Sequence, residues 1–201
     1  MQKLQTQMMS LIQSNTAEAV KVAQQAALYR VNKLLKFLSS QDFAVFENFI
    51  EDMAKYPASS EVKHHSSYPG GLLVHSVLVM EVALSVAEAL SYNEPQNVVM
   101  ALLLHDVGKI GQYTNYESDK ENKRWLKVKQ EVPHQIRSLL LASKELQAFK
   151  VLPEEVWQAV AFHGSAYSNM AKEVEHKEFF LTLIIQLADK WANKMERFEC
   201  N

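Results

Sequence analysis

Histidine and aspartate residues recur along the chain at positions where they could bind metal ions. His75 lies within the apolar run Leu-Leu-Val-His-Ser-Val-Leu-Val, and the pair His105-Asp106 directly follows three leucines. Asp189 interrupts another apolar segment, where a buried carboxylate without a positive partner would be costly. Because a divalent cation satisfies imidazole nitrogens and carboxylate oxygens together, these residues predict a metal site.

Two further histidines extend this set. His134 follows Pro133, and His163 precedes Gly164. Apart from the adjacent His105 and Asp106, successive candidates are separated by between 26 and 30 residues, about one helix and one loop, so successive helices of a bundle could each contribute to the site. Six ligands are too many for one metal with an open position, and they favour two divalent cations bridged by Asp106. The six candidate metal ligands are His75, His105, Asp106, His134, His163 and Asp189.

The composition predicts an all-α fold to position these residues. Only 5 Gly and 5 Pro occur among 201 residues, so turns are few and the elements are long. Tyrosines, a polar turn and a Lys-Val-Lys alternation break the helical pattern within 111–129, where we expect a short β-hairpin. We expect helices over about 4–38, 43–55, 71–90, 95–108, 133–149, 153–164 and 175–199, with His105 and Asp106 in the last turn of the fourth.

The chain is expected to form one globular unit, with N-terminal helices (1–56) that pack on or extend a domain over 57–201. Its single cysteine, Cys200, cannot form an intramolecular disulfide, which fits a reducing compartment. The most apolar stretches are only seven residues long, so we expect no membrane partner and a cytoplasmic location. A net charge of -2 gives no global electrostatic reason to bind nucleic acid, so any such affinity must be local.

The pattern of these residues resembles a known family. His75, the doublet within Leu-Leu-Leu-His-Asp-Val-Gly-Lys, and Asp189 within Leu-Ala-Asp-Lys are similar to the motif of the HD-domain metal-dependent phosphohydrolases, over about 63–194. His134 and His163 match the extra histidines of the two-metal branch, which includes cyclic dinucleotide phosphodiesterases and a group of 3'-5' exoribonucleases. The stretch before His75 resembles the exoribonucleases and the HD modules of some conjugative relaxases, although no strand block precedes the motif here.

The resemblance implies an HD-domain helical bundle that holds two divalent metal ions, drawn from Mn, Fe, Ni, Co, Mg or Zn. It implies a phosphodiesterase or phosphomonoesterase in which Asp106 bridges the metals and Lys109 contacts the substrate phosphate. Lys109 also has a structural reading, because Gly108 and a following cation are typical of a helix end. His64 and His65 are expected in a loop at the mouth of the site, as substrate-binding or simply exposed residues.

The segment 120–129 is basic and contains Trp125, so Arg124 is a candidate to bind a nucleotide or oligonucleotide substrate. A solvated hairpin is the alternative reading. Two other functions stay open. Some HD proteins with the same six ligands are mixed-valence di-iron oxygenases, and an HD domain can also be a non-catalytic binding or assembly module. In either case, the apolar N-terminal helices would be candidates for self-association into a homo-oligomer.

Overall fold

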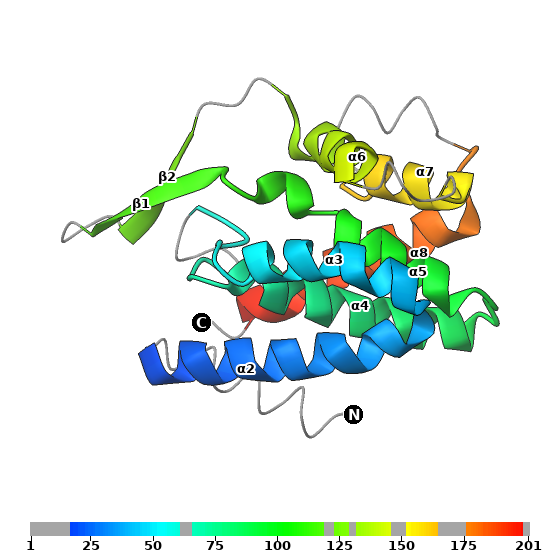
Figure 1. Ribbon diagram of the computed structural model, residues 1–201, viewed down its shortest axis with the longest axis horizontal. Helices are drawn as coiled ribbons and strands as arrows, with labels where there is room; N and C mark the ends of the chain where they lie inside the picture. The colour runs from blue at the N-terminus through cyan, green and yellow to red at the C-terminus, as the bar shows by residue number, and fades with distance from the viewer. Residues whose placement is uncertain are drawn as a thin grey trace.

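A computed structural model of the chain describes residues 17–60, 66–118, 123–128, 132–145, 152–164 and 176–198. The described part is a helical bundle with one β-hairpin (Figure 1), which confirms the predicted all-α fold class and its hairpin. The helices are α2 (Ala17–Leu34), the short η1 (Leu35–Phe37), α3 (Ser40–Met53), α4 (Gly71–Ala89), α5 (Pro95–Leu104), the short η2 (Val107–Lys109), α6 (His134–Glu145), α7 (Glu154–Phe162) and α8 (Phe180–Phe198).

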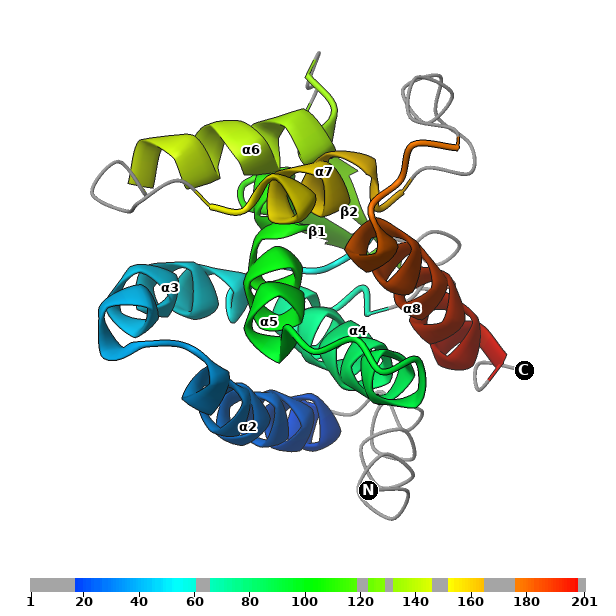
Figure 2. The same ribbon diagram turned by 90° about the vertical axis from the view of Figure 1, so that its right-hand side faces the viewer.

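Helix α4 occupies the centre of the bundle. It packs against α5, with α2 on one side and α8 on the other (Figure 2). Among the described residues, α4 is the one helix that is long and apolar enough to cross a membrane, with a mean hydropathy of 1.8. Because 61% of that apolar window is buried inside the protein, the place of α4 in the core accounts for its composition.

Helix α2 packs against α4 through small apolar residues. Ala23, Ala27 and Val31 recur every four residues and are fully buried, which lets the two helices approach closely. Arg30 of α2 also forms an ion pair with Glu81 of α4. The described part of the N-terminal region is therefore packed into the same core as the rest of the chain.

Helix α5 ends earlier than predicted. It was expected to continue to Gly108, but it stops at Leu104, and a turn at His105 and Asp106 leads into η2. The backbone carbonyl of His105 accepts a hydrogen bond from Ser138 Oγ (2.9 Å), and the amide of Gly108 donates to the same hydroxyl (2.8 Å). The hydroxyl of Ser138, on α6, thus bonds backbone groups that would otherwise pair within a continued helix, and α5 ends before them.

The last helix begins later than predicted, at Phe180 rather than near 175. Gln158 of α7 explains this start. Its Oε1 accepts a hydrogen bond from the amide of Phe179 (2.6 Å), and its Nε2 donates to the carbonyl of Lys177 (3.2 Å). These bonds hold the preceding segment against α7 in a non-helical conformation. In α8 the buried positions Leu181, Ile184, Ile185, Ala188 and Ala192 follow a helical period and face the core.

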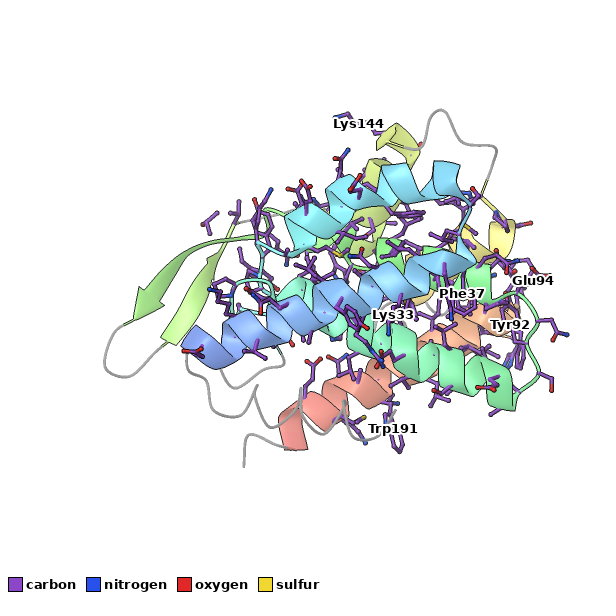
Figure 3. All side chains as sticks on the ribbon, turned by 60° about the horizontal axis from the view of Figure 1, so that its bottom comes forward. Lys33, Phe37, Tyr92, Glu94, Lys144 and Trp191 are labelled. Atoms are coloured by element: carbon purple, nitrogen blue, oxygen red, sulfur yellow. The ribbon has the colours of Figure 1, made fainter. Side chains whose placement is uncertain are left out.

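The hairpin consists of β1 (Tyr113–Ser118) and β2 (Lys123–Lys127), paired antiparallel. It projects away from the helices (Figures 1 and 3). Gly111, with φ +70°, turns the chain from η2 into β1. The amide of Gln112 donates to the carbonyl of Lys109 (2.9 Å), so the hairpin begins directly beside η2.

Candidate metal centre

The packing of five segments brings the six predicted ligands together. His75 lies in the first half of α4, and His105 and Asp106 form the turn after α5. His134 is the first residue of α6, His163 directly follows α7, and Asp189 lies in the middle of α8. All but Asp189 and His134 are buried, and these two are partly buried.

Asp106 lies between two pairs of imidazoles, and its two carboxylate oxygens face different pairs. Oδ2 lies 3.4 Å from Nε2 of His105 and 3.7 Å from Nε2 of His75. Oδ1 lies 3.3 Å from Nε2 of His134 and 3.6 Å from Nε2 of His163. A carboxylate in this position can offer one oxygen to each of two neighbouring cations.

The ligand atoms form two overlapping groups. One contains His75, His105 and Asp106, the other contains Asp106, His134 and His163, and within each group the candidate atoms lie within 4.8 Å of one another. The rings also adjoin: His105 and His163 have centroids 5.0 Å apart, and those of His134 and His163 are 5.4 Å apart. The Nε2 atoms of His134 and His163 are 3.4 Å apart, a spacing that a shared cation would explain.

Hydrogen bonds at Nδ1 leave Nε2 as the inward atom of two histidines. Nδ1 of His105 lies 2.7 Å from the carbonyl oxygen of Leu102, and Nδ1 of His163 lies 2.8 Å from that of Val160. A carbonyl accepts only, so Nδ1 carries the proton, and Nε2 of a neutral ring has its lone pair directed to the cluster. This arrangement is typical of metal-binding histidines.

His75 is oriented by a carboxylate that was not among the predicted site residues. Its Nδ1 lies 3.2 Å from Oε1 of Glu196, and its Nε2 lies 3.2 Å from Oδ1 of Asp189. Ser66 Oγ donates to the other oxygen of Glu196 (3.2 Å). Glu196 follows Asp189 by seven residues on α8, two helical turns, and this spacing is the signal that could have revealed it.

The site attracts positive charge. Burial alone would lower the pKa of His75, but the carboxylates of Glu196 and Asp189 outweigh it and raise that pKa to about 10. Burial alone would raise the pKa of Asp189, but its hydrogen bond with His75 holds that pKa below the ordinary value. The pair of carboxylates therefore favours a cation at the position of Nε2, either a proton or a metal ion.

The pKa of His134 is lowered, in contrast to that of His75. Burial lowers its pKa to about 3; Asp106 opposes this shift, and Lys109 adds to it. The ring is therefore neutral at neutral pH, as a metal ligand must be.

Two buried atoms test whether a metal fits. Among the described residues, Nε2 of His105 and Oδ1 of Asp106 are buried and have no hydrogen-bond partner. Leaving such atoms unsatisfied is costly, and both belong to ligand types that divalent transition metals prefer. The donor set therefore fits one or more divalent cations.

Lys109 directs its ammonium group to the centre of this cluster. Its Nζ donates to Oδ2 of Asp106 (2.7 Å), and its side chain is 13% exposed. Burial alone would raise the pKa of Asp106, but Lys109 and then His105 hold it well below the usual range. Burial likewise would lower the pKa of Lys109, but Asp106 keeps it raised. A cationic Lys109 thus adjoins the ligands at neutral pH.

Gly108 allows the two halves of the site to meet. A Cβ on this residue would lie 2.0 Å from the carbonyl oxygen of His134 and 2.7 Å from the amide nitrogen of Ser138. Only a glycine fits this contact between η2 and the first turn of α6. Gly108 was predicted to end a helix, whereas in the structure it lies in η2 and lets the first turn of α6, with His134, approach Asp106.

Three further candidate residues, His64, His65 and Arg124, lie wholly or partly outside the described part of the structure. His64 and His65 lie outside the described residues. Arg124 lies in β2, where its backbone pairs with Glu117, and its side chain also lies outside the described part.

One family of known proteins matches this chain. The family model of the HD domain matches residues 72–194, more than half of the chain, and this range includes all six candidate ligands. No curated protein and no solved structure matches the chain. Domains of this family are generally hydrolases that act on phosphoesters with the help of metal ions. Because this match covers more than half of the chain, the chain belongs to the HD domain family, and its helical bundle and its two groups of residues that could hold a metal ion are consistent with that family.

Proposed function

We propose that this protein is a phosphohydrolase of the two-metal HD branch that cleaves a phosphoester in a nucleotide or nucleic acid. The observation that carries this proposal is the position of Asp106. Its oxygens are divided between the His75–His105 pair and the His134–His163 pair, as a bridging carboxylate requires.

The ligands divide accordingly. His75, His105 and Asp189 would hold one cation, His134 and His163 would hold the other, and Asp106 would contact both. When bound, divalent cations would activate a water molecule and neutralise the charge that develops on the phosphoryl oxygens. Imidazole and carboxylate ligands suit Mn, Fe, Ni, Co and Zn, and Mg is the weaker match.

In the reaction, a water oxygen adds to phosphorus and the P–O ester bond breaks. One proton of the water leaves to the surrounding solvent, and the departing alkoxide takes up another. Lys109 would bind a non-bridging phosphoryl oxygen, because its ammonium group lies next to Asp106, beside which the phosphate would bind. His64 and His65, which precede α4 by a short segment, would extend the substrate site at its mouth.

The test is hydrolysis of bis-p-nitrophenyl phosphate by the Mn-loaded protein. We expect turnover by the wild type and its loss in Asp106→Ala, with circular dichroism unchanged. Asp52→Ala, which removes an exposed carboxylate on α3, serves as the matched control and should leave turnover intact. Undiminished turnover by the Asp106→Ala variant would reject the proposed site.

The same ligands would also serve a di-iron oxygenase, so dioxygen uptake is measured beside hydrolysis. Uptake dependent on a phosphonate or polyol by the iron-loaded protein, without phosphoester hydrolysis, would replace the proposed reaction class. We further propose a cytoplasmic location, and we propose self-association as a property of the N-terminal region.

A further inference from the structure

The β-hairpin is joined directly to the metal centre. Tyr113, the first residue of β1, follows Lys109 by four positions. The amide of Gln112 donates to the carbonyl of Lys109 (2.9 Å), and the amide of Val128 donates to the carbonyl of Gln112 (3.0 Å). Both ends of the hairpin are thus fixed beside the candidate catalytic lysine, while its body extends from the helices (Figures 1 and 3).

An irregularity in the register decides which residues share a face. Tyr113 pairs with Lys127 and Thr114 with Leu126, but Tyr116 then pairs with Trp125, so Asn115 is an extra residue in β1. Paired residues occupy the same face of an antiparallel ribbon, and residues two apart on a regular strand also share a face. Without the bulge, Tyr113 and Tyr116 would fall on opposite faces.

By backbone register, the bulge therefore places the aromatic residues of the two strands on one face, together with two lysines. This aromatic face contains Tyr113, Tyr116, Ser118, Lys123, Trp125 and Lys127. The opposite face contains Thr114, Glu117, Arg124 and Leu126. The two sets of residues differ in type, because the register assigns three aromatic residues and two lysines to the first.

The aromatic face is the one that continues into the metal centre. Tyr113 is buried at the base of the hairpin, whereas Thr114 on the opposite face is exposed. Burial is the main reason that the pKa of Tyr113 is raised, and Lys109 and Asp106 lie near enough to influence it as well. The face that begins at Tyr113 thus begins beside Lys109.

We propose that the aromatic face is a binding platform for single-stranded nucleic acid, which it guides to the metal centre. Bases of any sequence stack on aromatic rings, and lysines between the rings bind the phosphates. This inference rests on the proposed function in taking a phosphodiester as the ligand, and it narrows the substrate from nucleotides in general to an oligonucleotide chain. It also assigns the cationic contacts to Lys123 and Lys127 rather than to Arg124.

The length of the face supports a chain rather than a mononucleotide. Tyr116 lies three residues beyond Tyr113, or about 10 Å along an extended strand. The Tyr116–Trp125 pair therefore lies farther along the ribbon from Lys109 than Tyr113 does. Neighbouring nucleotides of the same strand would occupy it.

The test measures binding separately from turnover. Fluorescein-labelled oligothymidylate and oligouridylate of about 12 nucleotides, with phosphorothioate linkages that slow hydrolysis, are titrated with the Mn-loaded full-length protein and followed by anisotropy. We expect Trp125→Ala to weaken binding about tenfold or more. Trp125→Phe, which retains an aromatic ring, should restore most of the affinity and shows that the loss does not come from unfolding of the hairpin.

Two matched control variants test whether an effect on binding is specific to the aromatic face. Trp191→Ala removes a 58% exposed tryptophan from α8, away from the hairpin (Figure 3), and should leave affinity unchanged. Leu126→Ala changes the neighbouring residue on the opposite face and should also have little effect. Replacing Lys123 and Lys127 by Gln should reduce the slope of log affinity against log salt by about 1.4, because each phosphate contact to a single strand contributes about 0.7.

An oligonucleotide of the same length without bases separates stacking from charge. Its binding should be insensitive to Trp125→Ala, and equal losses for both ligands would overturn the stacking role. Equal affinities of the Trp125→Ala and Trp191→Ala variants would overturn the inference itself. If the wild type binds as expected but does not hydrolyse bis-p-nitrophenyl phosphate, the proposed function fails and the binding platform stands. If the wild type hydrolyses bis-p-nitrophenyl phosphate but Trp125→Ala does not change oligonucleotide binding, the binding platform fails and the proposed function stands.

Discussion

Nδ1 of His75 lies 3.2 Å from Oε1 of Glu196, and both side chains are almost fully buried. This contact joins α4 to α8 and turns Nε2 of His75 to the other ligands. A carboxylate that accepts the Nδ1 proton of a ligating histidine fixes its tautomer and makes Nε2 a stronger donor to a metal.

We predict that Glu196→Gln lowers the affinity for Mn by about tenfold or more, because the amide can hold the ring but lacks the negative charge. Metal titration by calorimetry measures this change. Glu88→Gln, at an exposed position on α4, is the control and should bind Mn as the wild type does. Equal Mn affinities of the Glu196→Gln variant and the wild type would show that this contact only supports the fold.

We predict that replacing His134 and His163 together by Ala reduces the bound metal from two ions to one. These residues adjoin Oδ1 of Asp106, whereas His75 and His105 adjoin Oδ2 and should still hold their own cation. Native mass spectrometry of the Mn-loaded protein counts the ions. Retention of both ions, or loss of both, would contradict a site divided at Asp106.

The contact of Gly108 with α6 predicts a large effect of one methyl group. Gly108→Ala places a Cβ 2.0 Å from the carbonyl oxygen of His134, so α6 must move, at a cost of about 3 kcal/mol or more in the free energy of unfolding. Gly111→Ala is the matched control. No atom lies within 4 Å of its added Cβ, and only its φ of +70° is unfavourable, so we expect a loss of about 1 kcal/mol. Urea unfolding measures both, and similar losses would contradict the packing role.

The pKa of His75 predicts how the metal-free protein responds to pH. That pKa is about 10 in the folded state, against an ordinary value of 6.5, because Glu196 and Asp189 outweigh the effect of burial. Between these two values the folded state binds more protons than the unfolded state, so stability is full below about 6.5 and falls as the pH rises to about 10. Urea unfolding at pH 7 and pH 9 measures the change, and His75→Gln should remove this contribution.

The same proton predicts that metal binding depends on pH. A cation that binds Nε2 of His75 must displace a proton below pH 10, so metal affinity should increase with pH. His134, with a pKa of about 3, is already neutral and should release none at pH 7. Calorimetry in buffers of different ionisation enthalpy counts the protons released. Affinity that is constant from pH 6.5 to pH 9 would show that His75 does not bind the metal.

The ion pair between α2 and α4 predicts that the N-terminal helix stabilises the whole domain. Arg30→Ala leaves the 9% exposed carboxylate of Glu81 without its cation, and we expect a loss of about 2 kcal/mol or more in the free energy of unfolding. Lys21→Ala, at an exposed position of α2, should cost much less. A single cooperative unfolding transition that shifts in Arg30→Ala would support one folding unit. A change confined to a separate early transition would argue for an independent N-terminal unit.

Residue types and their spacing were enough to predict the class of the fold, the position of the hairpin and the types of the candidate ligands. Helical periodicity and the scarcity of glycine and proline are local properties, so they can be read without a structure. Apolar neighbours around His75, His105 and Asp189 also showed that these polar residues needed partners.

How the candidate ligands meet depends on contacts between helices that are far apart in the chain. The end of α5 depends on Ser138, and the start of α8 depends on Gln158, both from other helices. The pairing of Glu196 with His75 and the approach of Gly108 to α6 likewise join segments far apart in the chain. Residue types and spacing along one strand or helix do not specify such contacts, because packing between elements sets which donor reaches which acceptor.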